Sequence, residues 1–401
     1  MCNFVPGECH AFGLRKDINE VETGDLPGRV EILPLQYTEE GRESPFANYG
    51  FVRVTEIPHG LELETVSRLS ALLANPIRNR RAVAELNYLL PKAMPRVSPM
   101  ADGELSDLAI QWATMTRSIA ANVGVPTAPA VALIDSGVNV RSIRGRSLTR
   151  LDFSNGAPGN PAINESEPNG HGTRVARVLH ESLPPAVPII SAKIGDTDDE
   201  VTVLGLCRAF AETVARFQPA VVNISLAPFD DTYTCPRCGE PVKTPAFHSA
   251  IIRRVFSLAN RSFVVMAAGN ERQSCNQRLI DDGVENLVFA VAVGSRGGKT
   301  RYSASPSGPD SQHLAVLAFG GDDLSSKHGL GVFQDDRKAV GTSFAAPFVT
   351  AGIYPAAAQL SATGNGMTRN DVLRPMHHQS GLGWIPNWIP RAHWRDWRYL
   401  F

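Results

Sequence analysis

Short apolar runs alternate with amphipathic stretches along the chain from about residue 126 onward. The runs show no alternation of polar and apolar positions, which is typical of parallel strands buried on both faces. Strands are expected at 130–134, 188–194, 220–224, 263–268 and 287–293, and helices between them at 172–181, 203–217 and 245–260. The pattern therefore predicts an α/β fold, a doubly wound parallel sheet with helices on both faces.

The chain before residue 126 has a different pattern, because its apolar residues recur at helical spacing. We expect one helix around 63–73 and another around 105–119, and a short extended piece at 50–56. The apolar stripes are Leu63, Val66, Leu69 and Leu73 in the first helix, and Leu105, Leu108, Trp112, Met115 and Ile119 in the second. The sequence thus predicts a mainly helical N-terminal region, residues 1–125, followed by a second unit, residues 126–401.

The charge balance narrows the range of partners. The formal net charge is −1, with 43% hydrophobic and 20% charged residues, as in an ordinary globular protein. Such a protein has no general attraction for nucleic acid or for an anionic membrane. No apolar stretch approaches the roughly 18 residues needed to span a bilayer. We therefore expect no nucleic acid and no membrane among the partners.

The first residues and the cysteines bear on the cellular compartment. Residues 1–25 show no basic stretch followed by an apolar core, so we expect no secretory signal. Without such a signal, the six cysteines are better interpreted as thiols than as three disulfides. Together these features predict a cytoplasmic protein.

Two polar residues stand where the pattern places a strand end and a helix start. Asp135 ends the first buried strand, in VALIDSGVN, where a carboxylate costs desolvation unless it has a partner. His171 opens a helix in NGHGTRVARVL, where the helix dipole favours the neutral imidazole that can act as a general base. Taken alone, each has a plain alternative, a turn residue for Asp135 and a polar helix-start residue for His171.

Ser343 and Asn270 occupy comparable positions. Ser343 opens a helix of small residues in VGTSFAAPFVTAG, where unpaired N–H groups of the first turn can donate to an oxyanion. It is alternatively an ordinary N-cap serine. Asn270 follows a buried strand in FVVMAAGNE, where its amide is either a second oxyanion donor or a turn residue. Along the chain the order is Asp, His, Asn, Ser, and Asp-His-Ser is the triad order of subtilisin.

These segments together resemble a known family. VALIDSGVN, NGHGTRVARVL and VGTSFAAPFVTAG resemble the three signature segments of the subtilisin-like serine proteases, the subtilase or peptidase S8 family. MAAGNE resembles the family's oxyanion-asparagine segment, and VVNISLAP its edge segment that pairs with the substrate backbone. The resemblance runs from about residue 126 to about 365. It implies a serine endopeptidase that hydrolyses protein or peptide substrates through an acyl-enzyme intermediate, with 126–401 as the peptidase domain.

The resemblance also implies a role for individual residues. Asp135 would orient His171, and His171 would take the proton from Ser343. Asn270 and the backbone N–H of Ser343 would hold the oxyanion. The residues expected to contact substrate are Ser225, Leu226 and Ala227 beside its backbone, and Ala267, Ala268 and Gly269 as the wall of the specificity pocket. The resemblance implies no cofactor for catalysis and leaves calcium open.

Two features depart from the family's pattern. Arg174 and Arg177 stand where the family has histidine and glycine, which indicates altered packing behind the histidine helix or a partner there. Residues 1–125 resemble no familiar inhibitory propeptide. We interpret them as an unusual propeptide or a permanent regulatory region that restrains the protease, the alternative being an extension that only supports the sheet.

Cys235 and Cys238 form a C-x-x-C pair in an insertion, which is half of many zinc sites. Structural zinc, reduced thiols and a disulfide all stay open for this pair. His248, Cys207 and Cys275 are the candidates for the further ligands that a zinc site needs.

Four tryptophans lie close to the end of the sequence: Trp384, Trp388, Trp394 and Trp397. They either fold back onto the body as core or dock a regulatory protein partner. The competing function for the whole chain is an inactive subtilase-fold binding or scaffold protein, with the cysteine pair as a zinc-knuckle interaction site. All four catalytic positions are filled, which argues against it.

Overall fold

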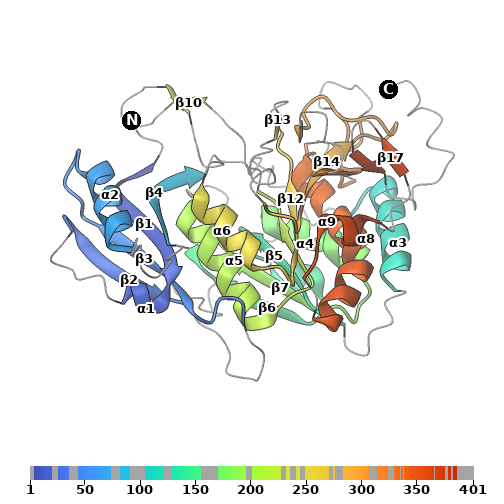
Figure 1. The fold of residues 1–401 in the computed structure, drawn as a ribbon. Coiled ribbons are helices and arrows are strands. Elements are labelled where there is room, and N and C mark those ends of the chain that lie inside the picture. Colours follow the sequence, from blue (N-terminus) through green and yellow to red (C-terminus); the bar gives the residue numbers. More distant parts are fainter. Residues whose placement is uncertain are drawn as a thin grey trace.

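Two sheets organise the chain in the computed structural model, a large one that is mostly parallel and a smaller antiparallel one beside it (Figure 1). The structure describes residues 4–19, 26–35, 44–73, 82–90, 104–121, 128–154, 170–195, 201–226, 232–234, 241–243, 249–270, 274–275, 283–306, 314–323, 329–334, 336, 338–364, 366–374, 378–380 and 383–385.

The large sheet is built from the apolar runs of the second unit. Its order is β17-β18-β16-β14-β12-β9-β5-β7-β6, and neighbours from β18 to β6 run parallel, whereas β17 is antiparallel to β18. The bounds are β5 (Val131–Asp135), β6 (Leu148–Asp152), β7 (Ile189–Lys193), β9 (Val221–Ile224), β12 (Phe263–Ala267), β14 (Leu287–Val293), β16 (Ala315–Phe319), β17 (His378–Ser380) and β18 (Gly383–Ile385).

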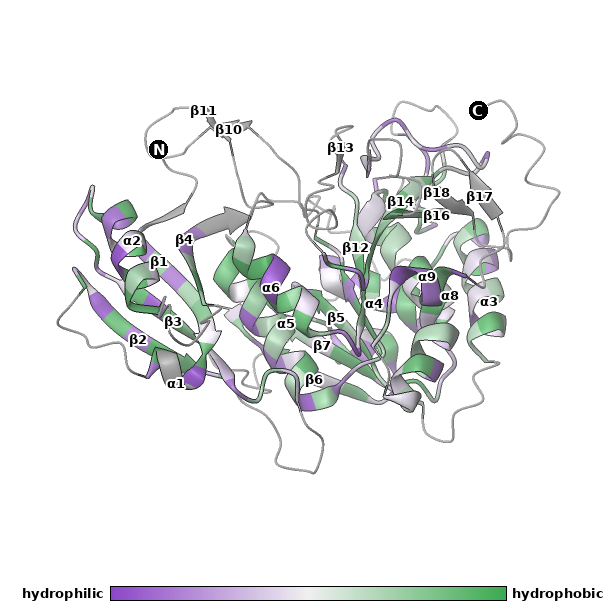
Figure 2. Ribbon diagram, viewed as in Figure 1, coloured by the Kyte–Doolittle hydropathy of each residue, from purple (hydrophilic) through white to green (hydrophobic). Residues whose placement is uncertain are grey.

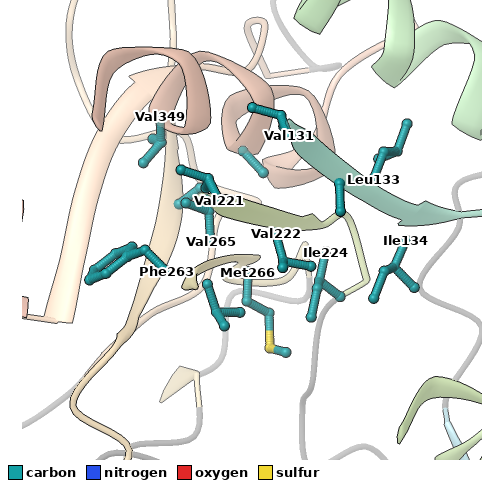
Figure 3. Close-up of a cluster of buried hydrophobic side chains, with 14 of the residues drawn as sticks. Val131, Leu133, Ile134, Val221, Val222, Ile224, Phe263, Val265, Met266 and Val349 are labelled. Carbon is teal, nitrogen blue, oxygen red and sulfur yellow. The ribbon is translucent and has the colours of Figure 1, made fainter. Parts of the chain in front are cut away.

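The centre of this sheet is buried on both faces. Every residue of β5, β9 and β12 is inaccessible to solvent or nearly so. Figure 3 shows their side chains pointing to the two sides of the sheet, with Val349 of α8 packed from one side. Each such side chain contributes roughly 1.5–3 kcal/mol when it leaves water. The uninterrupted apolar runs thus form strands here because helices cover them on both sides.

Helices form a layer on each face of the large sheet (Figure 1). One layer contains α3 (Asp107–Ala120), α4 (His171–Ser182) and α8 (Thr342–Thr363), which contact one another. The other contains α5 (Val203–Phe217) and α6 (Ala250–Leu258). The shorter elements are η3 (Val140–Ile143), α9 (Arg369–Leu373), β10 (Thr232–Thr234) paired with β11 (Pro241–Lys243), and β13 (Ser274–Cys275) paired with β15 (Ser305–Pro306).

The smaller sheet has the order β2-β3-β1-β4-β8, and all its neighbours are antiparallel. Its elements and the helices joined to it are β1 (Phe4–Leu14), α1 (Arg15–Ile18), β2 (Arg29–Pro34), β3 (Tyr49–Thr55), α2 (Glu62–Leu73), β4 (Val83–Leu90) and β8 (Val201–Thr202). β8 lies directly before α5 in the sequence. The N-terminal sheet is therefore completed by a strand from the second unit.

The two faces of the N-terminal sheet have different neighbours. One face packs on α2 and forms a separate small core that includes Val52, Val54 and Leu69. On the other face, Phe12 and Phe51 belong to the main core of the molecule, with their ring centroids 4.9 Å apart. Helices α5 and α6 contact β4. The N-terminal sheet thus shares one hydrophobic core with the second unit.

The predicted strands and helices of the second unit are confirmed, as are the extended piece at 50–56 and the two N-terminal helices, α2 and α3. The prediction of a mainly helical N-terminal region is confirmed only in part, because β1 to β4 also lie there. β2 is mostly exposed or half-buried and β3 is buried only in part, so polar residues interrupt their apolar runs. The boundary after residue 125 stays a prediction.

The most hydrophobic residues lie on the central strands of the large sheet and along α8, which packs on it (Figure 2). Within the described ranges, no helix combines the length and the apolar character that a membrane span requires.

Candidate active site

Asp135 is the last residue of β5 and is buried. Its Oδ1 accepts a hydrogen bond from the backbone N–H of Ser136 at 2.7 Å and lies 2.8 Å from Nδ1 of His171. Its Oδ2 has no hydrogen-bond partner among the described residues. The carboxylate at this strand end, which burial alone would disfavour, is therefore held by the histidine and the turn that follows β5.

His171 is the first residue of α4, and its side chain is fully buried. A carboxylate can only accept a hydrogen bond, so the ring hydrogen lies on Nδ1 and the lone pair on Nε2. Nε2 is buried and has no hydrogen-bond partner among the described residues. The imidazole is thus oriented by Asp135, and its basic nitrogen is available to a proton donor.

Gly172 allows α4 to approach β5 closely. A Cβ at this position would lie 2.4 Å from the carbonyl oxygen of Gly137 and 3.0 Å from Oδ1 of Asp135. The backbone N–H of Gly172 donates to Oγ of Ser136 at 3.0 Å. His171 therefore provides the imidazole, and the absence of a side chain at Gly172 lets that imidazole reach the carboxylate of Asp135.

Ser343 is the second residue of α8 and is 1% exposed. Its own carbonyl oxygen accepts from Oγ of Ser225 at 3.2 Å, and Ser225 in turn accepts from Nδ2 of Asn223 at 2.8 Å. Oδ1 of Asn223 accepts from Oγ1 of Thr350, two turns further along α8. A chain of polar side chains thus fixes the start of α8 to the end of β9.

Asn270 lies beyond β12 and contacts the residue before Ser343. Its Oδ1 accepts from the backbone N–H of Thr342 at 2.9 Å and lies 3.2 Å from Oγ1 of the same residue. That hydroxyl accepts from the backbone N–H of Gly269 at 3.0 Å. These contacts assign the amide oxygen to Thr342, so the side chain offers its Nδ2 hydrogens to a ligand.

The structure brings together the helices that carry His171 and Ser343, but the expected hydrogen bond between these two side chains is not formed. α4 and α8 contact each other, and the ring of Phe344 lies 5.8 Å from the His171 ring. Because Nε2 of His171 has no partner among the described residues, it makes no hydrogen bond to Ser343 in this structure. His171 and Ser343 are both covered from solvent.

The predicted substrate-contacting residues lie at the ends of β9 and β12. Ser225, Leu226, Ala267 and Ala268 are buried, and Gly269 has a positive φ of 112°. Ala227 lies outside the described residues. The contact of Ser225 with the carbonyl of Ser343 and the role of Thr342 were not predicted. A buried asparagine within the apolar run VVNIS was the sequence signal for the first of these.

The predicted metal ligands Cys235, Cys238 and His248 lie outside the described residues. Within the part of the chain that the structure describes, no three His, Cys, Asp or Glu side chains cluster as metal ligands would. Cys207 is a free thiol buried in α5, and burial raises its pKa well above the usual value. This thiol is inert toward exchange, because only the thiolate is reactive.

Comparison with known proteins identifies the family whose sequence model matches this chain. The model of the subtilase family matches residues 127–380. The nisin leader peptidase from Lactococcus lactis is a similar solved structure, with 17% identity and a TM-score of 0.50 over 70% of this chain and 92% of the other. An epidermin leader peptide processing serine protease from Staphylococcus aureus, solved as a mutant, has 12% identity and a TM-score of 0.57 over 92% and 93%. A search of curated proteins found no match.

Proposed function

Because the chain belongs to the subtilase family and is therefore a serine endopeptidase, we propose that Asp135, His171 and Ser343 form its catalytic triad. The observation that carries the proposal is the buried 2.8 Å contact between Asp135 and His171, which leaves Nε2 as the free basic nitrogen of the pair. Phe344, which directly follows Ser343 on α8, has its ring 5.8 Å from the His171 ring.

The proposed reaction has two halves. In the first, Nε2 of His171 takes the hydroxyl proton of Ser343 while Oγ attacks the scissile carbonyl carbon. The protonated imidazole gives that proton to the leaving amine, the C–N bond breaks, and an acyl-enzyme remains. In the second, water gives a proton to Nε2 and attacks the ester, and Ser343 regains its proton. Asp135 stays ionised throughout and stabilises the imidazolium.

The developing oxyanion needs donors that are already in place. The backbone N–H of Ser343 is in the first turn of α8, where N–H groups have no partner within the helix. Asn270 is held through its oxygen by Thr342, which leaves its NH₂ group to donate. We assign these two groups to the oxyanion, and the ends of β9 and β12, with Ser225 to Ala227 and Ala267 to Gly269, to the substrate.

A serine-directed probe tests the triad. Wild-type protein, after removal of any inhibitory segment, should form a covalent adduct with a fluorophosphonate at Ser343, seen by intact mass and by peptide mapping. Ser343→Ala should lose both the adduct and peptidase activity, whereas Ser361→Ala, near the end of the same helix, should lose neither. Folded wild-type protein without an adduct would instead support an inactive scaffold.

We also propose that the N-terminal region restrains the protease. β4 pairs with β8 through Leu89 and Leu90. Asn87 accepts from the first turn of α5 at 3.2 Å, and Glu85 accepts from Ala250 at the start of α6 at 3.1 Å. The reacting side chains are covered from solvent, so a substrate reaches them only after part of the molecule moves. These contacts support a region that stays docked on the peptidase body.

A truncation tests this restraint. Because α3 packs on α4 and α8, the shortened chain should begin at Ala101 and keep that helix. Restraint predicts that this chain is more active than the full chain and that residues 1–100, added separately, inhibit it. A folded truncated chain with no higher activity would assign the N-terminal region to support of the sheet.

A cytoplasmic location is part of the proposal. The described free thiols, Cys9 and Cys207, are consistent with a reducing compartment. Fractionation of cells that express the chain, with detection of the protein in each fraction, tests the location.

A further inference from the structure

The arginine that departs from the family pattern has a buried partner. Arg174 lies one turn after His171 on α4, and its Nη1 is 2.7 Å from Oδ2 of Asp336. The two side chains are 5% and 8% exposed. The pair therefore sits inside the molecule, where its geometry is fixed by packing.

Asp336 belongs to a tight turn that leads to the serine. Its Oδ1 accepts from the backbone N–H of Lys338 at 2.9 Å, and its carbonyl accepts from Ala339 at 3.1 Å. The N–H of Val332 donates to the carbonyl of Ala339 at 2.9 Å and closes the turn. One carboxylate thus holds the turn 332–339 with one oxygen and α4 with the other.

The same turn reaches the imidazole through aromatic rings. The guanidinium of Arg174 lies over the ring of Phe333, 5.2 Å from its centroid. Phe333 meets Phe344 edge to face at 5.8 Å, and Phe344 lies 5.8 Å from the ring of His171. Phe344 directly follows Ser343. The side chains of Arg174, Phe333, Phe344 and His171 thus form a continuous series of contacts. The series begins and ends on α4 and includes the residue that follows Ser343.

The start of α3 holds the turn from the other side. Ser106 donates through its N–H to the carbonyl of Val332 at 3.0 Å and through Oγ to that of Gly331 at 2.9 Å. The N–H of Gln334 donates to the carbonyl of Glu104 at 2.8 Å. The turn is therefore held by α3 on one side and by Arg174 of α4 on the other.

We propose that Arg174 and Asp336 are positioning residues that set the placement of His171 on α4 relative to Ser343 on α8. The inference rests on the proposed triad. Buried ion pairs add little net stability over apolar side chains of similar size, so stability alone does not account for this one. What the pair does provide is a fixed distance and orientation between α4 and the turn that precedes Ser343.

The test separates positioning from folding. Arg174→Met and Asp336→Asn, made singly, each leave a buried group without its partner and should lower the melting temperature. The double variant removes both charges, so its melting temperature should return towards that of the wild type. Its kcat, measured with any inhibitory segment removed, should stay about tenfold to a hundredfold lower with KM changed little, because a displacement of about 1 Å can cost that much. Its rate of fluorophosphonate labelling at Ser343 should fall in parallel.

Arg117→Met is the matched control. Arg117 also joins two of these helices, α3 and α4, through Glu181, but both side chains of this ion pair are exposed. It should retain kcat and labelling.

A double variant that folds and keeps wild-type kcat and labelling would overturn the inference, whereas a wild-type protein that is neither labelled nor active would overturn the proposed triad. If the double variant does not fold, wild-type kcat in Arg174→Lys overturns the inference, because lysine lacks the planar group that covers Phe333.

Discussion

At the scale of single residues, the close approach between α4 and β5 depends on one missing side chain. Gly172 faces the carbonyl of Gly137 and the carboxylate of Asp135 with no room for a methyl group. Both obstacles are fixed, one as backbone and the other by its bond to His171. The distance within the buried pair is therefore sensitive to this position.

Gly172→Ala should displace the first turn of α4. We expect a destabilisation of roughly 1–3 kcal/mol, the usual range for overpacking, and a loss of activity larger than stability explains. Urea unfolding and kcat measure the two effects. Gly205→Ala on α5 is the control, because its Cβ would meet only Oγ1 of Thr202, at 3.3 Å, and alanine favours the helix. Equal effects of the two substitutions would contradict the argument.

Asn270→Ala should lower kcat by about 10²–10³ with little change in KM, as expected for an oxyanion donor that acts mainly in the transition state. The substitution also removes the acceptor for Thr342. Asn270→Asp is the paired variant, because it keeps that acceptor and replaces only the donor. A loss in the alanine variant that aspartate restores would assign Asn270 to orientation of Thr342 instead.

The sequence placed Asp135, His171, Asn270 and Ser343 correctly at strand ends and helix starts, because these positions follow from the apolar runs. It did not predict the contact of Arg174 with Asp336, since the two residues are far apart in the chain and meet only in the fold. The arginine was noticed as a departure from the family pattern, and its partner came from the structure.

At the scale of elements, the C-terminal end of α4 is closed by an arginine from another segment. Arg146 donates to the carbonyls of Pro184 and Val187 at 2.7 Å, of His180 at 2.8 Å and of Leu183 at 2.9 Å. Burial lowers the pKa of this guanidinium to about 10, and it stays charged at neutral pH. The carbonyls of the last turn of α4 and of the loop that follows it thus share one cation.

Arg146→Met should destabilise the protein by roughly 3 kcal/mol, since the carbonyls of His180, Leu183 and Val187 lose the arginine donor together. The free energy of unfolding in urea is the measurement. Arg68→Met, which breaks an exposed pair with Glu64 on α2, should cost no more than about 0.5 kcal/mol. If the two variants lose the same amount, the cap contributes nothing beyond an ordinary surface contact.

Two of the strands that were not predicted, β6 and β1, have a physical reason for it. β6 at the edge of the large sheet carries the sequence LTRLD, in which polar and apolar residues mix because one side is only partly covered. β1 has an irregular register between Phe4 and Cys9, which breaks any simple alternation. Five strands buried on both faces, β5, β7, β9, β12 and β14, were predicted from their apolar runs, but β16, which is equally buried and apolar, was not. Edge and irregular strands depend on neighbours that the sequence does not name.

At the scale of the whole molecule, the contact between the N-terminal sheet and the peptidase body contains a buried histidine. His10 is fully buried, and neither ring nitrogen has a hydrogen-bond partner among the described residues. Its Nε2 lies 3.8 Å from Oε1 of Glu85, which is beyond hydrogen-bond distance. Burial, with Arg53 nearby, lowers the pKa of His10 to about 3, and burial raises the pKa of Glu85 to about 7. The contact is therefore between neutral groups at mildly acidic pH.

His10→Leu should make the protein less sensitive to acid. The unfolded chain protonates His10 below its usual pKa of 6.5 while the folded protein does not, so this residue lowers stability as the pH falls from 6.5 towards 3. At pH 5 the difference is about 2 kcal/mol, by the conversion of 1.36 kcal/mol for each pH unit. Glu85 acts in the opposite direction, since its raised pKa costs stability as the pH rises from 4.5 to about 7.

Melting temperatures of wild type and His10→Leu from pH 4 to 8 isolate the His10 contribution, because Glu85 is present in both. His59→Leu, at an exposed position of the same region, is the control and should leave the wild-type profile unchanged. Parallel pH profiles for wild type and His10→Leu would contradict the prediction.

The shared core of the N-terminal sheet has a consequence for synthesis on the ribosome. The sheet leaves the ribosome first, but its last strand, β8, and the helices that cover its second face, α5 and α6, follow much later. Only after these have emerged does the chain reach α8, which carries Ser343. If folding keeps pace with synthesis, the N-terminal sheet is docked before the nucleophile exists as part of the nascent chain. The restraint proposed for the N-terminal region would then be in place before the proposed triad is complete.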